Sequence, residues 1–272
     1  MISEILLVAG IAVLSLALRS FAHPVAFRIG TFGFVATSFL AGWILGGSLL
    51  LGTLFASTWF LLPWFEILTR IRRMRLPLHR SLEKCPPPPY SSFPTFGDLT
   101  EQMEEAGFEY VEDVDWNHDQ SRHFYRLFYN PKLKTTGTIC LVEQDQFSFY
   151  YSTLSSYSLD GRHFLTWNYP FSPTMHLLPR TVLNRVEDDA TVGELIQMHE
   201  DFLATNAIDF AHMIEKSTSS LRADAELEMR ELLEHNVAKG IFTQDSEQMI
   251  RYSLRGMFYL WAQFLREFVR FS

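Results

Sequence analysis

The residues with the clearest potential for chemistry form an acidic run between positions 113 and 119. Side chains with oxygen atoms occupy alternate positions: Asp113, Asp115, Asn117 and Asp119. An EF-hand calcium loop begins with the same alternation. The pattern then fails, because His118 replaces the loop glycine at position six and Phe124 replaces the bidentate glutamate at position twelve. We therefore interpret the run as a solvated acidic turn between strands.

Histidines and cysteines give weaker signals. His123, His163 and His176 fall in or after expected strands, and a shared sheet face would make them a metal or acid–base site. Strand-borne histidines beside aromatic residues are more often packed, so this site is the minor alternative. Cys85 and Cys140 are too few for a zinc site and fit a reducing cytoplasm. The chain has no G-x-S-x-G, Walker, H-E-x-x-H, C-x-x-C or G-x-G-x-x-G motif. We expect a non-enzymatic protein without a cofactor.

Aromatic side chains are the remaining candidates for a ligand site. Several are concentrated in expected strands and would line an apolar pocket or simply fill a core against a helix: Tyr125, Phe128, Tyr129, Phe147, Phe149, Tyr150 and Tyr151. The core interpretation needs no ligand, so we prefer it.

A long apolar run at residues 31–68 predicts that part of the chain lies in a membrane, and the candidate groups above must therefore lie outside that part. It has no charged residue before Glu66, and as one helix it would be roughly 57 Å long, whereas about 20 residues cross a bilayer. We expect an integral membrane protein. The run is either one long tilted helix or a hairpin of residues 31–47 and 49–68 that turns at Gly46, Gly47 and Ser48. An earlier apolar segment at residues 5–22 is just long enough to span.

Charge predicts the topology. Arg19 and Arg28 separate the first two apolar segments, and a basic cluster follows the anchor: Arg70, Arg72, Arg73, Arg75, Arg80 and Lys84. The positive-inside rule places both groups on the cytoplasmic side, which three crossings achieve and two do not. We favour three, with the C-terminal portion in the cytoplasm in either case, and a bacterial inner membrane as the location.

Small residues in the anchor share helix faces at the positions Gly42, Gly46, Ser48, Gly52 and Ala56. Such spacing lets helices approach closely in lipid. It indicates docking with another membrane subunit or a second copy, or packing of the hairpin on itself. Trp59 and Trp64 fit an aromatic belt beside the basic flank of Arg70, Arg72, Arg73 and Arg75.

The chain divides by charge and composition. Residues 1–84 carry eight Lys/Arg against three Asp/Glu, whereas residues 85–272 carry 15 against 28. An acidic domain of this kind disfavours nucleic acid as a partner. We expect a transmembrane anchor (1–69), a basic segment along the headgroups with a Pro-rich linker (70–97), a cytoplasmic α+β domain (98–218) and a helical C-terminal extension (219–272).

Within the soluble part, Asp98 with Glu101 and Thr191 with Glu194 have capping-box spacing, so each predicts a helix start. Dense aromatic and β-branched residues predict consecutive antiparallel strands, a meander flanked by helices, at 108–116, 122–130, 137–143, 146–154 and 162–169. Further helices are expected at 191–205, 209–216, 221–239 and 246–271.

The last expected helix has apolar residues on one face and arginines towards another. Its candidate contact residues are Arg251, Arg255, Trp261, Arg266 and Arg270. The pattern suits a core or subunit contact, a membrane-surface helix, or a winged-helix-like unit.

Taken together, these features favour an accessory or scaffold subunit of an oligomeric membrane complex, whose partners are other membrane subunits or further copies and the bilayer. A membrane-tethered ligand-binding or sensory domain with an aromatic-lined pocket is the alternative. An enzyme with an unrecognised site is a third hypothesis.

Overall fold

Three apolar helices begin the chain. The computed structural model describes residues 2–21, 23–119, 121–144, 147–187 and 189–270, without the side chains of residues 24, 269 and 270. The helices are α1 (Ile2–Arg19), α2 (Pro24–Gly46) and α3 (Leu49–Thr69). Each is long and apolar enough to cross a membrane. Arg28 lies inside α2, so of the two arginines expected between the first two segments only Arg19 remains next to the turn.

The turn between α2 and α3 has the predicted position. Gly47 takes a left-handed φ of 62° after the end of α2, a conformation that glycine adopts without a steric cost. Ser48 then caps α3, because its Oγ accepts a hydrogen bond from the Leu50 amide at 3.2 Å. The alternative of a single long helix is therefore wrong.

Glycines bring the two helices of this hairpin close together. A Cβ atom on Gly42 would lie 2.7 Å from the carbonyl oxygen of Leu51, and one on Gly52 would lie 2.8 Å from the carbonyl oxygen of Phe39. A Cβ atom on Gly46 would meet the Leu51 side chain at 2.3 Å. Three of the predicted small residues thus serve contact within the hairpin, whereas Ser48 is the helix cap and Ala56 is half-buried. Docking of this face on another subunit stays a prediction.

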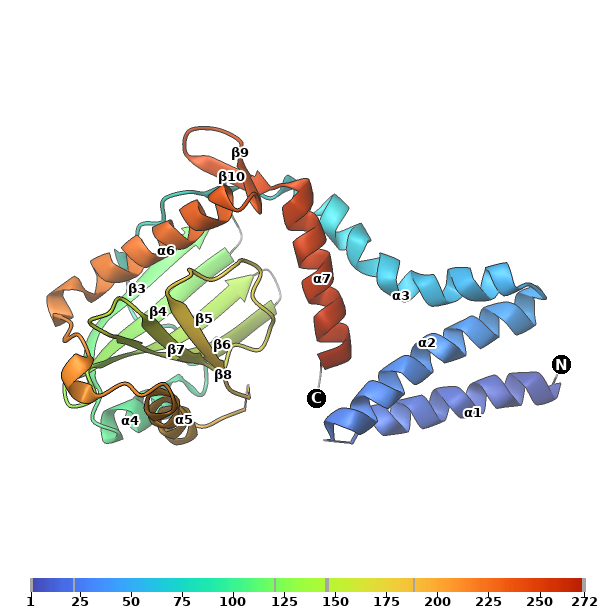
Figure 1. The fold of residues 1–272 in the computed structure, drawn as a ribbon, viewed down its shortest axis with the longest axis horizontal. Helices are drawn as coiled ribbons and strands as arrows, with labels where there is room; N and C mark the ends of the chain where they lie inside the picture. The colour runs from blue at the N-terminus through green and yellow to red at the C-terminus, as the bar shows by residue number, and fades with distance from the viewer. Residues whose placement is uncertain (1, 22, 120, 145–146, 188, 271–272) are drawn as a thin grey trace.

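A mixed sheet of seven strands forms the centre of the second part of the chain (Figure 1). Its spatial order is β2-β3-β4-β5-β6-β7-β8, antiparallel except for the last pair, β7 with β8. The strands are β2 (Glu83–Lys84), β3 (Glu109–His118), β4 (Ser121–Asn130), β5 (Thr135–Gln144), β6 (Phe147–Tyr157), β7 (His163–Trp167) and β8 (Thr181–Arg185). The predicted meander is present, and β2 and β8 extend it at either edge.

Alternate residues of these strands enter two different cores. On one face α4 (Phe96–Glu105) and α5 (Val192–Thr205) cover an apolar cluster that includes the fully buried Phe124 and Phe128. On the other face α6 (Leu221–Ala238) packs Leu221 and Met229 over Tyr125 and its neighbours. Figure 1 shows α6 along one side of the sheet and α4 and α5 on the opposite side. Whether residue 219 starts a separate extension stays a prediction, but α6 forms part of the core of the sheet.

The last helix connects the sheet to the apolar helices. Helix α7 (Leu254–Arg270) contacts both α2 and α3, and the Trp261 Nε1–H donates to the carbonyl oxygen of Phe60 at 2.8 Å. In Figure 1 α7 lies between the sheet and the three N-terminal helices. A small sheet of order β1-β10-β9 precedes it, formed by β1 (Leu76–Pro77), β9 (Phe242–Gln244) and β10 (Met249–Tyr252). The basic segment and the end of the chain therefore pair with each other.

Three sequence predictions of helix limits are wrong. The helix expected from residue 246 begins at Leu254, because residues 249–252 pair as β10 with β1 and β9. Helix α4 begins at Phe96 with Thr95 as its N-cap, so Asp98 lies inside the first turn and caps nothing. The segment 209–216 forms only a short 3₁₀ turn, since its backbone bonds to the end of β6 through Ile214 and Tyr157, at 2.7 Å. The second capping box, Thr191 with Glu194, is confirmed.

His199 makes the folded protein sensitive to acid. Its ring is 2% exposed and lies between the hydroxyls of Ser156 (2.9 Å) and Thr166 (2.8 Å). Burial, reinforced by the charge of His163, lowers the pKa of His199 to about 4. The unfolded chain takes up this proton near pH 6.5 but the folded protein only near pH 4, so stability is lost as the pH falls between these values.

We expect this loss to be on the order of 3 kcal/mol at pH 4, since each pKa unit corresponds to about 1.4 kcal/mol. The measurement is the Tm of the full chain in detergent at pH 7 and pH 4.5, for the wild type and for His199→Gln. The variant should lose less stability on acidification than the wild type. His212→Gln, at an exposed position, is the control and should keep the wild-type difference. Equal differences in all three proteins would contradict the assignment.

Candidate functional site

The acidic run does not form a solvated turn, and that interpretation is wrong. Asp113 and Asp115 lie in the middle of β3 and are 5% and 9% exposed. Asp113 accepts two hydrogen bonds of 2.7 Å from Arg126, and Asp115 accepts one of 2.9 Å from Arg122. Among the described residues no group of three or more His, Cys, Asp or Glu side chains is placed to hold a metal ion. Both carboxylates are ion-pair partners within the sheet.

The three strand histidines occupy separate environments. His123, on β4, packs against Trp116 with 5.0 Å between the ring centroids. His163, on β7, stacks on Tyr157, and His176 packs on Tyr259 at 4.5 Å. Of these three histidines, His163 is the one that lies within ion-pair distance of a carboxylate, that of Glu228, and it lines a cavity with it.

The cavity lies between the sheet and α6 and has a volume of about 240 Å³. Its floor consists of side chains from β4, β5, β6 and β7 that point to the α6 face, and its roof is the inner side of α6 with Ala225, Glu228 and Met229. Most of the wall is apolar, with Leu165, Leu178 and the buried Cys140 among the lining residues. Burial raises the pKa of the Cys140 thiol to about 12, so it stays protonated. The aromatic residues of the meander are divided between the two faces. Those that line this cavity are Tyr125, Tyr151, Tyr157 and Trp167.

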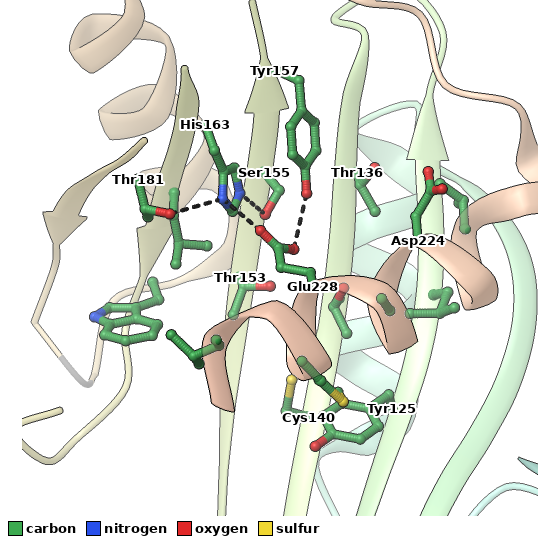
Figure 2. Close-up of a pocket in the computed structure, with 18 of the residues that line it drawn as sticks. Tyr125, Thr136, Cys140, Thr153, Ser155, Tyr157, His163, Thr181, Asp224 and Glu228 are labelled. Atoms are coloured by element: carbon green, nitrogen blue, oxygen red, sulfur yellow. Dashed lines mark hydrogen bonds and ion pairs between the residues drawn. The ribbon is translucent and has the colours of Figure 1, made fainter. Parts of the chain in front are cut away.

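One end of the cavity is polar, and Figure 2 shows its side chains converging on the carboxylate of Glu228. His163 Nδ1 lies 2.8 Å from Glu228 Oε1, and the Tyr157 hydroxyl donates to Oε2 at 3.0 Å. His163 Nε2 is 3.2 Å from Ser155 Oγ, and Nδ1 is 3.4 Å from Thr181 Oγ1. The His163 and Tyr157 rings are parallel within 5°, with 4.4 Å between centroids. These contacts fix the orientation of the Glu228, His163 and Tyr157 side chains.

The same contacts set the charge of Glu228. Burial acts to raise the pKa of its carboxyl, but the hydrogen bonds and charge from His163, followed by the hydrogen bond from Tyr157, hold that pKa below its ordinary value. Burial and the neighbouring carboxylate raise the pKa of Tyr157 well above 10. At neutral pH the cavity therefore contains a carboxylate that accepts hydrogen bonds and a neutral tyrosine that already donates to it. A further buried donor, Trp167 Nε1, lines the cavity and has no hydrogen-bond partner among the described residues.

Ser155, His163 and Glu228 have the connectivity of a nucleophile, a base and an orienting carboxylate. Acyl transfer also requires donors that stabilise the oxyanion. Ser155 lies in the interior of the sheet, where its backbone pairs with Thr136 on one side and Leu165 on the other. The amides around this serine are thus engaged in the ladder, and the arrangement favours recognition of a polar group over covalent catalysis.

The tryptophans predicted to lie at a membrane interface form contacts between helices. Trp59 donates from Nε1 to Ser38 Oγ at 2.8 Å and stacks on Phe268 of α7 with a centroid distance of 5.8 Å. Trp64 packs on Phe258 of α7 at 4.9 Å. These contacts attach α7 to α3, and a place at the membrane interface stays a prediction.

Two of the four basic residues predicted beside the membrane form ion pairs with carboxylates. Arg70 lies 3.5 Å from Glu66, Arg75 forms an ion pair with Asp245, and Arg72 and Arg73 are exposed in a short 3₁₀ turn after α3.

One of the arginines expected on the terminal helix does not belong to it. Arg251 lies in β10 and pairs with Asp245 at 3.2 Å, so its placement on the helix is wrong. Arg255 and Arg266 are exposed on α7, and the side chain of Arg270 lies outside the described part of the chain.

Sequence reasoning missed Glu228, although a signal exists. Leu221, Ala225, Met229 and Leu232 repeat at helical spacing, and Glu228 places a carboxylate inside that apolar stripe. A buried carboxylate needs hydrogen-bond donors, so the stripe predicts polar partners on the facing strands. Compared with protein-family models, curated proteins and solved structures, the chain matches none of them.

Proposed function

We propose that this chain is an integral membrane protein whose cytoplasmic domain binds a small amphipathic molecule between α6 and the sheet. The cavity with a carboxylate at one end is the observation that carries the binding function. Three crossings place Arg19 and the basic residues after α3 on the same side, which under the positive-inside rule is the cytoplasm, as in a bacterial inner membrane. The expectation of a non-enzymatic protein belongs to this proposal.

The size and chemistry of the cavity define the ligand class. A cavity of about 150 Å³ holds benzene, whereas drug-sized ligands occupy about 300–1,000 Å³. At about 240 Å³ the present cavity suits a molecule of one or two rings or a short chain. The Glu228 carboxylate can accept a further hydrogen bond from a donor on the ligand, and Trp167 Nε1–H offers a hydrogen bond to an acceptor. A hydroxyl group on an apolar body provides both.

The test compares 2-naphthol with naphthalene, which share a body and differ in the hydroxyl group. We expect 2-naphthol to raise the Tm of the full chain in lipid nanodiscs more than naphthalene does. Ala225→Leu fills the cavity and should abolish both effects, while Ala223→Leu, on the exposed side of the same helix, should retain them. Glu228→Gln should remove the preference for the hydroxyl compound. Unchanged stabilisation in Ala225→Leu would contradict the proposed site.

Catalysis by Ser155 is tested separately with a serine-directed fluorophosphonate. We expect no covalent labelling of the wild type. If the wild type is labelled and Ser155→Ala is not, the result would contradict a purely binding function and favour acyl transfer at the same site.

The role of an accessory subunit remains an independent proposal, supported by the exposed apolar side chains of the three N-terminal helices. Gentle detergent extraction followed by native mass analysis tests it. Stoichiometric partners or a second copy are expected, and a lone chain would contradict it.

A further inference from the structure

A second hollow lies where α3 ends and the sheet begins. Its volume is about 880 Å³, and it is separate from the cavity under α6, although Tyr125 and Tyr151 line both. Three parts of the chain enclose it. The end of α3 and the basic segment contribute Arg70 and Arg73, the strands contribute aromatic side chains, and α7 contributes Leu260 and Phe264. The hollow thus has arginines on the side of α3 and apolar side chains on the side of α7.

Arg80 lines this hollow without a counter-ion among the residues that the structure describes. Its guanidinium lies 4.3 Å above the ring of Trp116, and its Nε atom is buried without a hydrogen-bond partner. Within the described residues no carboxylate pairs with it. Burial lowers the pKa of Arg80, and a guanidinium group keeps its proton in folded proteins. An uncompensated buried cation is costly, and an anion in the hollow would offset that cost.

The groups around Arg80 also suit an oxyanion. Burial raises the pKa of Tyr252 to about 12 and that of Tyr125 further, so their hydroxyls are neutral and able to donate. Burial, followed by the charge of Arg80, lowers the pKa of His123 to about 4, so this ring is neutral at pH 7 and contributes no charge to the hollow. Asp119 is the one acidic residue among the lining residues described, against Arg73, Arg80 and Arg70, of which Arg70 is paired with Glu66. Basic residues thus outnumber acidic ones in the described lining of the hollow.

We propose that this hollow binds the phosphate of an anionic phospholipid, with Arg80 as the principal ligand. The chemistry of recognition is that of any phosphate, but the position of the hollow favours a lipid as its source. Thr69 and Arg70 at the end of α3 form part of its wall, and the exposed ring of Phe264 on α7 gives acyl chains an apolar surface. The inference rests on the proposed membrane insertion and is independent of the ligand under α6.

The experiment measures lipid binding to the delipidated full chain by native mass spectrometry, with phosphatidylglycerol and with phosphatidylcholine. We expect phosphatidylglycerol to bind at least about tenfold more tightly, because hydrogen bonds to charged groups contribute the most. Arg80→Met should lose at least about tenfold in affinity for phosphatidylglycerol. Arg72→Gln removes an exposed charge of the same segment that does not line the hollow, and it should lose less than about fivefold.

A second measurement separates binding from folding. In detergent without lipid, Arg80→Met should have a Tm equal to or above that of the wild type, since the substitution removes a buried charge without a partner. Added phosphatidylglycerol should raise the Tm of the wild type but leave the Tm of Arg80→Met unchanged.

Four outcomes would overturn the inference: equal losses in Arg80→Met and Arg72→Gln, equal binding of phosphatidylcholine, displacement of the lipid by millimolar inorganic phosphate, or a lower lipid-free Tm in Arg80→Met. Failure to enter nanodiscs at all would instead contradict the proposed membrane insertion on which the inference rests.

Discussion

Replacing Asp113 with alanine is expected to lower the free energy of unfolding by about 3–5 kcal/mol, because it leaves the Arg126 guanidinium buried without a counter-charge. The side chains of Asp113 and Arg126 are 4% and 13% exposed, and two hydrogen bonds of 2.7 Å join them. Arg126 also donates to Thr100 Oγ1 at 3.0 Å and lies 4.1 Å from the Phe96 ring centroid, so it cannot turn to solvent without losing the contact between β4 and α4. Denaturant unfolding of the full chain in detergent, followed by tryptophan fluorescence, measures the change.

An exposed ion pair provides the control for Asp113→Ala. Arg230 and Glu234 lie 3.6 Å apart on α6 with side chains 45% and 53% exposed, so Glu234→Ala should cost less than about 1 kcal/mol. The double variant Asp113→Leu/Arg126→Met should recover much of the loss, since an apolar pair needs no counter-charge. If Asp113→Ala and Glu234→Ala destabilised the protein equally, the buried pair would have no special role.

Phe128→Ala is expected to have a comparable effect, about 3–5 kcal/mol, through a different cause. The Phe128 ring is fully buried in the cluster between the sheet, α4 and α5, and removing it leaves a cavity that rigid strands on both sides prevent from closing. The Tm of the variant, measured in detergent, gives the result. Phe147→Ala removes a ring that is 53% exposed and should change stability by less than about 1 kcal/mol. A small effect at Phe128 would show that the cluster relaxes around the missing ring.

Local signals in the sequence predicted several elements correctly. The hairpin of α2 and α3 follows from Gly47 and Ser48, where a left-handed glycine and a capping serine end one helix and start the next. The meander follows from the density of aromatic and β-branched residues, and α5 from its capping box. Each of these depends on residues close together in the chain, which is why periodicity and turn chemistry identify them.

Elements that depend on distant partners were not predictable. Strand β8 follows a proline-rich stretch and forms only because β7 offers a parallel edge to residues 181–185. Strand β10 has a helical pattern but pairs with Leu76 and Pro77, more than 170 residues earlier. The cavity depends on which side chains of four strands face α6, and Glu228 acquires its role only when His163 and Tyr157 lie opposite it. The Asp113–Arg126 pair was hidden for the same reason, because the register of β3 and β4 brings the two residues together.

The contact between Trp261 and Phe60 has a consequence for biosynthesis. The two residues are 201 positions apart, and at about 5–20 residues per second the ribosome needs roughly 10–40 s to make the chain between them. Under the proposed membrane insertion, the first three helices have time to enter the bilayer while α7 has yet to be synthesised. The side of α3 that later contacts α7 would meanwhile be covered by lipid or by a chaperone. Because β10 pairs with β1 and α7 contacts α2 and α3, the domain reaches its final position beside the apolar helices only after α7 has left the ribosome. A chain that terminates before β10 would retain the three apolar helices but lack the contacts that hold the domain against them.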